Sequence, residues 1–553
     1  MLSRYNKLLV GLGLMSMASC AHRTEQVARP KLVVGIVVDQ MRWDYLYRYY
    51  PRYSHDGFRR LISDGFNCQQ TMLSYIPAYT APGHTCIYTG SVPSIHGIAG
   101  NNWIDNRTGR NWYCVDDDAV TEANDTAHSF SPRNLLVSTV TDELRLATNF
   151  HSRVFGVAIK DRGSILPAGH AANAAYWYND KTGNFVTSTY YDKKYWSPDW
   201  LKTFNDNGNR ADNLAKQNWE LLDNIAAYTQ STSDTNGFED VFKGESLPVF
   251  PHKVSMLSRP DRLGALKTMP AGNTLTLDMA KACIAGEKLG GGDFTDFLCV
   301  SLSSTDYTGH QFGPNSVEAE DMFVRLDGEL ASFFKYLDET VGRGNYLLFL
   351  TADHGAAHNP QYLLSKNIPA GIWHNASADL NSYLQEQFKS PVPLVTAIAN
   401  YQVFFNDTFL IGNKSFNRDQ IKASAIDWLT NVMPKRYNVP VQYVMDMNDL
   451  NKTAVPEPIR QMAVNGYYHN RSGSVLIILN PGWFDSDRFT GTTHGSWNPY
   501  DTHIPLLWYG WHVPRGESHT EVHMTDIAPT VAALLHIQMP NGCVGKPITD
   551  LIK

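Results

Sequence analysis

The fold class is decided by the stretch KLVVGIVVD, residues 31–39. A short apolar run that is rich in β-branched residues is typical of a strand buried on both faces of a parallel sheet. The run ends in Asp39, which places a carboxylate at the carboxyl end of the predicted strand.

Two later runs repeat this order of a strand followed by a carboxylate. FLCVSLS, residues 297–303, precedes Asp306, and YLLFLTA, residues 346–352, leads into Asp353 and His354. In doubly wound sheets, ligands bind outside the carboxyl ends of the strands. We therefore expect side chains from these distant segments to converge on one site.

The intervening segments indicate how the chain is organised. Apolar residues recur at helical spacing over 315–337, and VLIIL, residues 475–479, indicates a further strand. Strands alternating with helices predict an α/β fold, a doubly wound and largely parallel sheet flanked by helices. The segments at about 165–255 and 371–490 lack this strand pattern. We interpret them as capping insertions in one domain, residues 30–553.

The first twenty residues, 1–20, have the pattern of an export signal. Arg4 and Lys7 precede the apolar run 8–15, and small residues and Cys20 follow. This run is too short to remain as a membrane-spanning helix. We expect an exported protein that is periplasmic or associated with the outer membrane, with Cys20 as a candidate lipidation site.

Six further cysteines follow, and an even number in an oxidising compartment favours disulfides. Cys283 with Cys299 is the preferred pair. The spacings lack the close pairs of a thiolate zinc site. The six are Cys68, Cys86, Cys114, Cys283, Cys299 and Cys543.

The charge of the chain excludes one class of partner. The formal net charge is −7 over 553 residues, which leaves no broad basic surface. A nucleic-acid backbone is therefore not an expected partner.

A set of carboxylates and histidines has the chemistry of a metal site. Taken singly, each is more often a turn, cap or packed residue, but together they supply ligands for two ions. Oxygen and imidazole ligands suit zinc and also manganese or iron. The set consists of Asp39, Asp306, His310, Asp353, His354 and His494. Four other histidines are interpreted as packed or turn residues: His84, His96, His170 and His503.

Six ordered fragments resemble the alkaline phosphatase superfamily, in its nucleotide pyrophosphatase/phosphodiesterase-like branch with the PafA-type bacterial alkaline phosphatases. The resemblance runs from residue 32 to the C-terminus. The fragments are VVD (37–39), YTAPGHT (79–85), HGI (96–98) followed by Asn101 and Asn102, STDYTGH (304–310), DHG (353–355) and THG (493–495).

The resemblance implies two zinc ions per chain and a threonine nucleophile. Asp306, His310 and His494 would bind one ion, and Asp39, Asp353, His354 and Thr80 would bind the other. Coordination to a dication stabilises an alkoxide, so Thr80 would attack phosphorus and form a phosphothreonine intermediate. A second interpretation makes Thr80 the N-cap of a helix that begins at Ala81-Pro82, and the two are compatible.

Three further residues are candidate donors to the phosphoryl oxygens of the substrate. The resemblance implies that Asn101 supplies an amide donor. Lys160 and Arg162 follow a strand-like segment, 154–159, and alternation along an extended chain directs both to the same side. A Lys-x-Arg pair is usually a solvated surface feature. In PafA-type enzymes, however, the corresponding pair binds the extra charge of a phosphate monoester.

The predicted activity is therefore that of an alkaline phosphatase, which hydrolyses small phosphate monoesters and is expected to be a monomer. The alternative is a phosphodiesterase or nucleotide pyrophosphatase with the same two zinc ions. A sulfatase is disfavoured, because the segment from Thr80 to His84 lacks the Cys or Ser and the Arg of that branch. A non-catalytic phosphate-binding protein is disfavoured because every ligand and the nucleophile are present.

Overall fold

The computed structural model describes residues 28–206 and 210–552. The predicted export signal, residues 1–20, and Cys20 lie outside the described residues. Across the described ranges, no helix combines the length and the apolar character that a membrane span requires.

A sheet of ten strands forms the centre of the larger lobe. Its middle strand is β1 (Leu32–Val38), which lies between β10 (Asp296–Leu302) and β11 (Tyr346–Thr351) and is parallel to both. All three strands are buried along their whole length, as their continuous apolar sequences predict. Beyond β10, the parallel order continues through β7 (Val154–Ala158) and β8 (Ala174–Asn179).

The outer strands make the sheet mixed. Antiparallel pairs join β8 to β9, β11 to β19, and β2 to both β18 and β19, whereas β20 pairs with β2 in parallel. The predicted α/β class with a largely parallel sheet is confirmed. The outer strands are β9 (Asn184–Val186), β2 (Phe66–Met72), β18 (His503–Ile504), β19 (Leu506–Gly510) and β20 (Gly516–His523).

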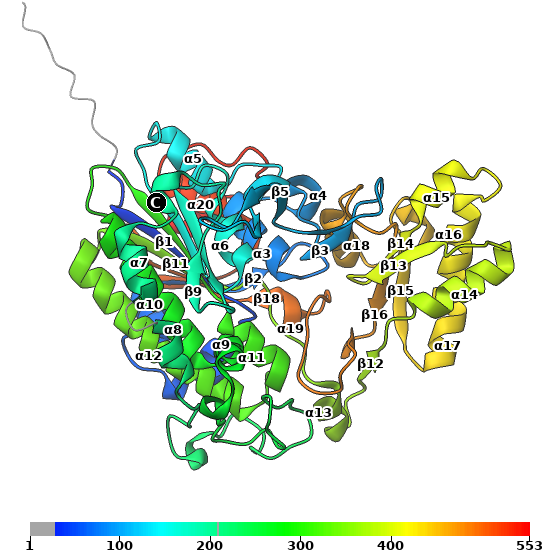
Figure 1. Cartoon of the computed structure of the whole chain (residues 1–553), viewed down its shortest axis with the longest axis horizontal. Helices are drawn as coiled ribbons and strands as arrows, with labels where there is room; N and C mark the ends of the chain where they lie inside the picture. The colour runs from blue at the N-terminus through cyan, green and yellow to red at the C-terminus, as the bar shows by residue number, and fades with distance from the viewer. Residues whose placement is uncertain (1–27, 207–209, 553) are drawn as a thin grey trace, which may run out of the picture.

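Helices cover both faces of this sheet, because both faces are apolar. In Figure 1, α3, α6 and α20 lie on one side of the sheet and α7, α10 and α12 lie on the other. The helix predicted over 315–337 is α12. The helices are α3 (Thr80–Thr89), α6 (Asp161–Ala168), α20 (Ile527–Leu534), α7 (Asp199–Asp206), α10 (Pro270–Glu287) and α12 (Val317–Leu337).

A smaller lobe with its own sheet and core projects to one side (Figure 1). Its antiparallel strands run in the order β13 (Val395–Ala399), β14 (Gln402–Phe405), β16 (Val475–Leu479) and β15 (Val441–Asp446). Its helices include α14 (Ser377–Phe388) and α16 (Arg418–Asp427). The strand predicted at 475–479 therefore exists, but it pairs inside this lobe and not in the central sheet.

Two sequence-based expectations differ from the structure. The segment 165–255 supplies β8 and β9 to the central sheet, because its aromatic residues pack as a strand although no long aliphatic run marks them. The predicted Cys283–Cys299 disulfide is wrong, since all six cysteines that the structure describes are unpaired. Cys283 lies on α10 and Cys299 on β10, and both thiols are packed in the core as small apolar groups.

Candidate functional site

The candidate site lies at the carboxyl end of the central strands. Asp39 follows β1, and Asp353 follows β11. Asp306 lies on α11 (Ser304–Phe312), which begins directly after β10. The parallel register aligns the ends of these strands, because Val38 pairs with Leu302 and Val37 pairs with Thr351. The sheet therefore brings Asp39 together with two carboxylates that are more than two hundred residues away in sequence.

The predicted metal ligands form two groups that adjoin each other. In each group, one ligand atom per residue lies within 4.8 Å of the corresponding atoms of the others. The first group consists of Asp306, His310 and His494, and the second of Asp39, Asp353 and His354. The rings of His354 and His494 stack with centroids 3.5 Å apart, so the two groups share a boundary.

The three histidines of these groups are oriented in the same way. Nδ1 lies 2.9 Å from the Thr492 carbonyl in His310, 2.9 Å from the Gly355 carbonyl in His354 and 2.6 Å from the Ala78 carbonyl in His494. A carbonyl oxygen only accepts, so each Nδ1 carries a proton and donates it. Each Nε2 therefore presents its lone pair to the carboxylates, which is the arrangement that metal-binding histidines require.

Burial makes this set of ligands fit a bound cation. Burial and the charges of Asp306 and Asp353 raise the pKa of Asp39 well above its usual value. Burial, together with His354 and His310, lowers the pKa of His494 well below its usual value. Within the described chain, Asp39 Oδ1 has no hydrogen-bond partner. Dications satisfy such buried oxygens and bind neutral imidazole, so the residues fit two metal ions.

Lys160 lies between the two groups. Its Nζ is 2.7 Å from Asp39 Oδ2 and 2.5 Å from Asp306 Oδ2, and the residue is 4% exposed. Burial opposes its charge, but the carboxylates of Asp306 and Asp39 raise its pKa above the usual value. The ammonium group therefore keeps its charge at the boundary of the two groups.

Arg162 follows Lys160 on a helix and not on an extended strand. The expected extended geometry is wrong, because α6 begins at Asp161, which makes Lys160 its N-cap and puts Arg162 in its first turn. Arg162 Nη1 instead donates to the hydroxyl of Tyr113, 3.0 Å away. Burial lowers the pKa of Arg162, but Tyr113 and Asp161 outweigh it and raise the pKa well above the usual value.

Thr80 and Asn101 are brought next to the ligand groups. Thr80 is 1% exposed, and its Oγ1 lies 3.4 Å from His354 Nε2. Asn101 Oδ1 accepts a hydrogen bond from the backbone N–H of Ala81, 2.9 Å away, so its amide is held beside Thr80. Asn102, the neighbour with which Asn101 could be confused, is exposed on β3 (Asn102–Ile104).

The interpretation of Thr80 as a helix cap is wrong. Tyr79 is the N-cap of α3, and Thr80 is its first helical residue. The side chain of Tyr79 makes no cap bond, and the N–H of Ala81 at this end of α3 donates to Asn101 Oδ1. The Thr80 hydroxyl is therefore available for chemistry.

Two residues outside the predicted site, His84 and Gln40, contact the ligand carboxylates. His84 lies one helical turn after Thr80, with Nδ1 2.9 Å from the Thr80 carbonyl and 3.2 Å from Asp353 Oδ2. It is a packed histidine, as expected, but it contacts a ligand. Gln40 directly follows Asp39 and donates to both Asp353 and Asp306. Neither residue carries a pattern that distinguishes it, because a hydrogen-bond donor leaves no periodicity in the sequence.

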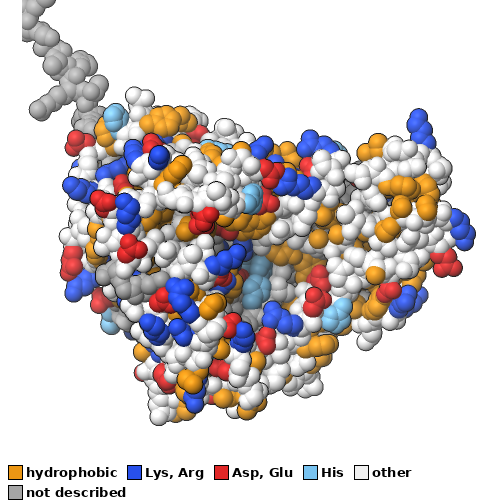
Figure 2. Space-filling model, in the orientation of Figure 1, with side chains coloured by type: hydrophobic (Ala, Val, Ile, Leu, Met, Phe, Trp, Pro, Cys, Tyr) orange, Lys and Arg blue, Asp and Glu red, His pale blue; other side chains and the backbone are white. Residues whose placement is uncertain are grey.

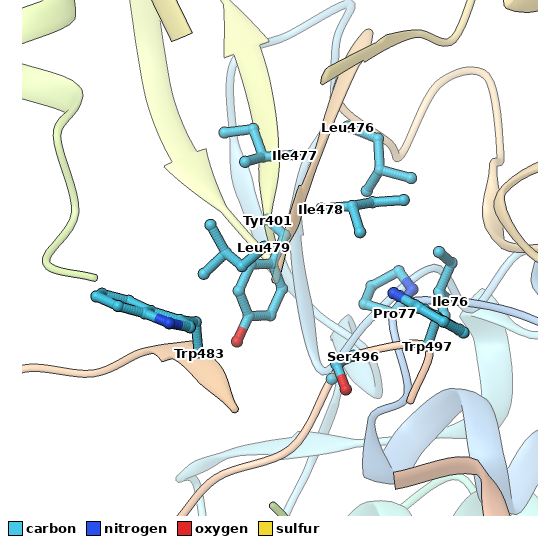
Figure 3. Close-up of a pocket in the computed structure, with 11 residues that line it drawn as sticks. Ile76, Pro77, Tyr401, Leu476, Ile477, Ile478, Leu479, Trp483, Ser496 and Trp497 are labelled. Carbon is cyan, nitrogen blue, oxygen red and sulfur yellow. The ribbon is translucent and has the colours of Figure 1, made fainter. Parts of the chain in front are cut away.

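The site faces the junction of the two lobes. Figure 2 shows histidine and basic side chains gathered there. A narrow apolar pocket at this junction is lined by Ile76 and Pro77 of the larger lobe, Tyr401 and Leu479 of the smaller one, and Trp497 (Figure 3). Gly495 and Ser496, which directly follow His494, also line it. The pocket thus adjoins one ligand of the first group.

Comparisons with known proteins agree with this geometry. A family model described as type I phosphodiesterase / nucleotide pyrophosphatase matches residues 33–501. The chain is 50% identical over 537 residues to a Myroides odoratus protein named calcium-transporting ATPase, with 96% of each chain covered. It is 50% identical over 532 residues to alkaline phosphatase PhoV of Synechococcus elongatus, covering 96% of this chain and 94% of PhoV.

Alkaline phosphatase PafA of Elizabethkingia meningoseptica is similar at 46% identity over 550 residues, with 99% of each chain covered. The crystal structure of wild-type PafA superimposes with a TM-score of 0.91, covering 96% of this chain and 100% of that chain. Sequence and fold thus agree over nearly the full length. The chain belongs to the type I phosphodiesterase / nucleotide pyrophosphatase family, as a close homologue of the PafA and PhoV alkaline phosphatases.

Proposed function

We propose that the protein is an exported alkaline phosphatase that hydrolyses phosphate monoesters through Thr80 with two zinc ions. The observation that carries the proposal is the pair of adjoining Asp/His groups beside the Thr80 hydroxyl. The names of the PafA and PhoV relatives support the substrate class.

Thr80 acts as the nucleophile, and the two Asp/His groups hold the metal ions. Thr80 Oγ1 forms a bond to phosphorus while the ester oxygen leaves as the alcohol, and water then hydrolyses the phosphothreonine to release phosphate. When bound, two dications supply charge neutralisation for the phosphoryl oxygens and lower the pKa of a coordinated hydroxyl. Asp306, His310 and His494 would hold one ion, and Asp39, Asp353 and His354 the other.

The donors around Thr80 bind the phosphoryl group. Asn101, held by the backbone of Ala81, offers its amide N–H groups beside the nucleophile. Lys160 brings a positive charge to the boundary of the two metal groups, where the oxygens of a dianionic monoester would lie. Arg162 supports the monoester preference through its retained charge. A diester carries one negative charge fewer, so it gains less from these cations.

The deciding experiment compares a phosphate monoester and a bis-ester of the same alcohol on zinc-loaded enzyme. We expect a higher kcat/KM for the monoester. Lys160→Ala and Arg162→Ala should lower kcat/KM for the monoester more than for the bis-ester. A bis-ester that is cleaved faster by the wild type would favour the diesterase activity that the family description names. The name of the Myroides relative is a reason to include ATP among the substrates.

Zinc is proposed because its borderline character suits a mixed imidazole and carboxylate ligand set. Elemental analysis of the purified protein should find about two zinc ions per chain. Reconstitution of metal-free protein with manganese or iron instead of zinc should restore less activity. Full activity with manganese alone would contradict the assignment of the metal.

A further inference from the structure

Gln40 contacts both metal groups at once. Its backbone N–H donates to Asp353 Oδ1 over 3.1 Å, and its side-chain Nε2 donates to Asp306 Oδ1 over 2.9 Å. The residue is 3% exposed. Through one residue, a carboxylate of the first group is thus linked to a carboxylate of the second.

The backbone at Gln40 is in an unusual conformation. Its φ is 64°, in the left-handed region that costs a non-glycine residue about 1 kcal/mol or more. Such a conformation persists only where the surroundings hold it. Here, the turn after β1 aims the N–H and the side chain of the same residue at the two carboxylates. A glycine would relieve the backbone but would lose the side-chain amide.

The neighbouring helix leaves room for this amide. Gly309 lies on α11 between Asp306 and His310, and a Cβ added there would lie 1.8 Å from Gln40 Oε1. The absence of a side chain at Gly309 therefore leaves the space that the Gln40 amide occupies beside α11. The turn of α11 that carries Asp306 and His310 thus has a glycine where the Gln40 amide, which binds Asp306, approaches the helix.

The amide is chemically suited to orient a ligand. It donates a proton without adding charge, so it fixes the carboxylate without competing with a cation as an ammonium group does. Asp306 Oδ1 also lies 3.2 Å from His310 Nε2, so the bond from Gln40 reaches the oxygen that faces the other ligands. A carboxylate oxygen accepts more than one bond and can bind an ion as well.

We infer that Gln40 is a positioning residue whose side-chain amide sets the affinity of the Asp306 group for its metal ion. The inference rests on the proposed two-metal function. Gln40→Leu and Gln40→Met remove the side-chain donor but keep the backbone N–H to Asp353. The affinity of one metal site should therefore fall, and the affinity of the other should stay close to that of the wild type.

The test is a zinc titration of the metal-free protein against a chromophoric chelator, with kcat/KM measured at each zinc concentration. We expect one site of Gln40→Leu to weaken by about 10- to 100-fold, the usual effect of losing an outer hydrogen bond to a ligand. Activity should return when zinc is raised. Gln40→Met gives the same answer if Gln40→Leu does not fold.

The matched control is Gln69→Leu, which removes another buried amide that donates to a carboxylate, Glu517, over 2.9 Å. It should leave both zinc affinities unchanged. Wild-type affinity at both sites of a folded Gln40→Leu or Gln40→Met variant would overturn the inference. Failure of the proposed function is distinguishable, because the wild type itself would then bind fewer than two zinc ions.

Discussion

Thr80 lies in the first turn of α3 but is not its N-cap. Tyr79 is the N-cap, and the N–H of Ala81 at this end of α3 donates to Asn101 Oδ1. The hydroxyl lies beside His354, and the neighbouring amide of Asn101 is fixed by the backbone. Removing the Thr80 hydroxyl should therefore change the chemistry of the site and leave the stability of the fold almost untouched.

For Thr80→Ala, we expect kcat to fall by about 1,000-fold or more, because a nucleophile has no substitute in the site. The zinc content should remain near two ions per chain, and the melting temperature should stay close to that of the wild type. The control is Thr139→Ala. Thr139 caps α5 (Val140–Ala147) in a capping box with Asp142, so its loss should cost about 1 kcal/mol of stability without reducing kcat. Full activity in Thr80→Ala would refute the nucleophile assignment.

Gly309→Ala is a second test of whether the Gln40 side chain supports zinc binding. Alanine is favoured over glycine in a helix, so the change should not destabilise α11 through the backbone. The new Cβ would displace the Gln40 side chain, whose flexible end is the nearest atom. Zinc affinity should fall at one site, as in Gln40→Leu, and titration with a competing chelator measures it. In the double variant Gly309→Ala/Gln40→Leu the two losses should not add, and an additive loss would contradict a shared cause.

The carboxylates of the two candidate metal groups could be predicted because Asp39, Asp306 and Asp353 each come shortly after a buried strand, whereas His494 follows no such strand and was identified through the resemblance. Gln40 could not be predicted, since its role depends on a left-handed backbone turn that the sequence does not mark. The extended geometry expected over Lys160 and Arg162 was wrong because the boundary between a strand and a helix lies at Lys160.

Among the elements, α12 and the segment that covers its start carry a cluster of buried charges outside the site. Glu318 lies in the first turn of α12 and contacts His252 over 3.1 Å, and Glu245 contacts the other nitrogen of His252. Burial and the charge of Glu318 raise the pKa of Glu239 to about 9. Glu239 Oε1 accepts from Asn236 over 2.6 Å.

This raised pKa makes stability depend on pH. In the unfolded chain, Glu239 loses its proton near pH 4.3, whereas in the folded protein it keeps the proton until about pH 9. The folded state thus binds more protons in this window, so stability falls as the pH rises through it. Glu239→Gln keeps the acceptor for Asn236 but does not titrate. Its melting temperature relative to the wild type should therefore increase from pH 6 to pH 9.

Above about pH 9 this difference should become constant, because the wild-type carboxyl is then ionised in both states. Scanning fluorimetry at fixed zinc and ionic strength measures it. Glu329→Gln is the comparison, since Glu329 is also buried but away from this cluster, and burial raises its pKa only to about 7. Its difference from the wild type should level off near pH 7. A pH-independent difference for Glu239→Gln would contradict the raised pKa.

The elements of the central sheet could be predicted where aliphatic runs mark strands that are buried on both faces, as in β1, β10 and β11. β8 was missed because its sequence, AAYWYN, is aromatic and short. The strand at 475–479 was predicted correctly, but its place in the sheet of the smaller lobe was not predicted. Partner choice depends on contacts between distant segments, which a single run of apolar residues does not specify.

On the scale of the whole molecule, the metal ions would tie together parts of the chain that come from opposite ends of the sequence. Their ligands follow β1 and β11, lie on α11 and come from the segment at His494. An ion bound only by the folded state stabilises it by about 4 kcal/mol at roughly 1,000 times its dissociation constant. Without ions, the ammonium group of Lys160, which contacts Asp39 and Asp306, offsets only part of the negative charge of the buried carboxylates.

Removing zinc should therefore lower the melting temperature by several degrees and restoring it should reverse the change, as followed by scanning fluorimetry. Identical melting temperatures with and without zinc would contradict the proposed metal sites. The Thr80→Ala variant should respond to zinc nearly as the wild type does.

The position of His494 has a consequence for the order in which the protein is made. The chain builds the smaller lobe before it returns to supply this ligand, and β19, which lies between β11 and β2, comes later still. A ribosome must therefore synthesise about nine-tenths of the polypeptide before the first metal group is complete. During synthesis the unfinished chain has neither its full set of candidate ligands nor a complete central sheet. Phosphatase activity is thus confined to finished molecules.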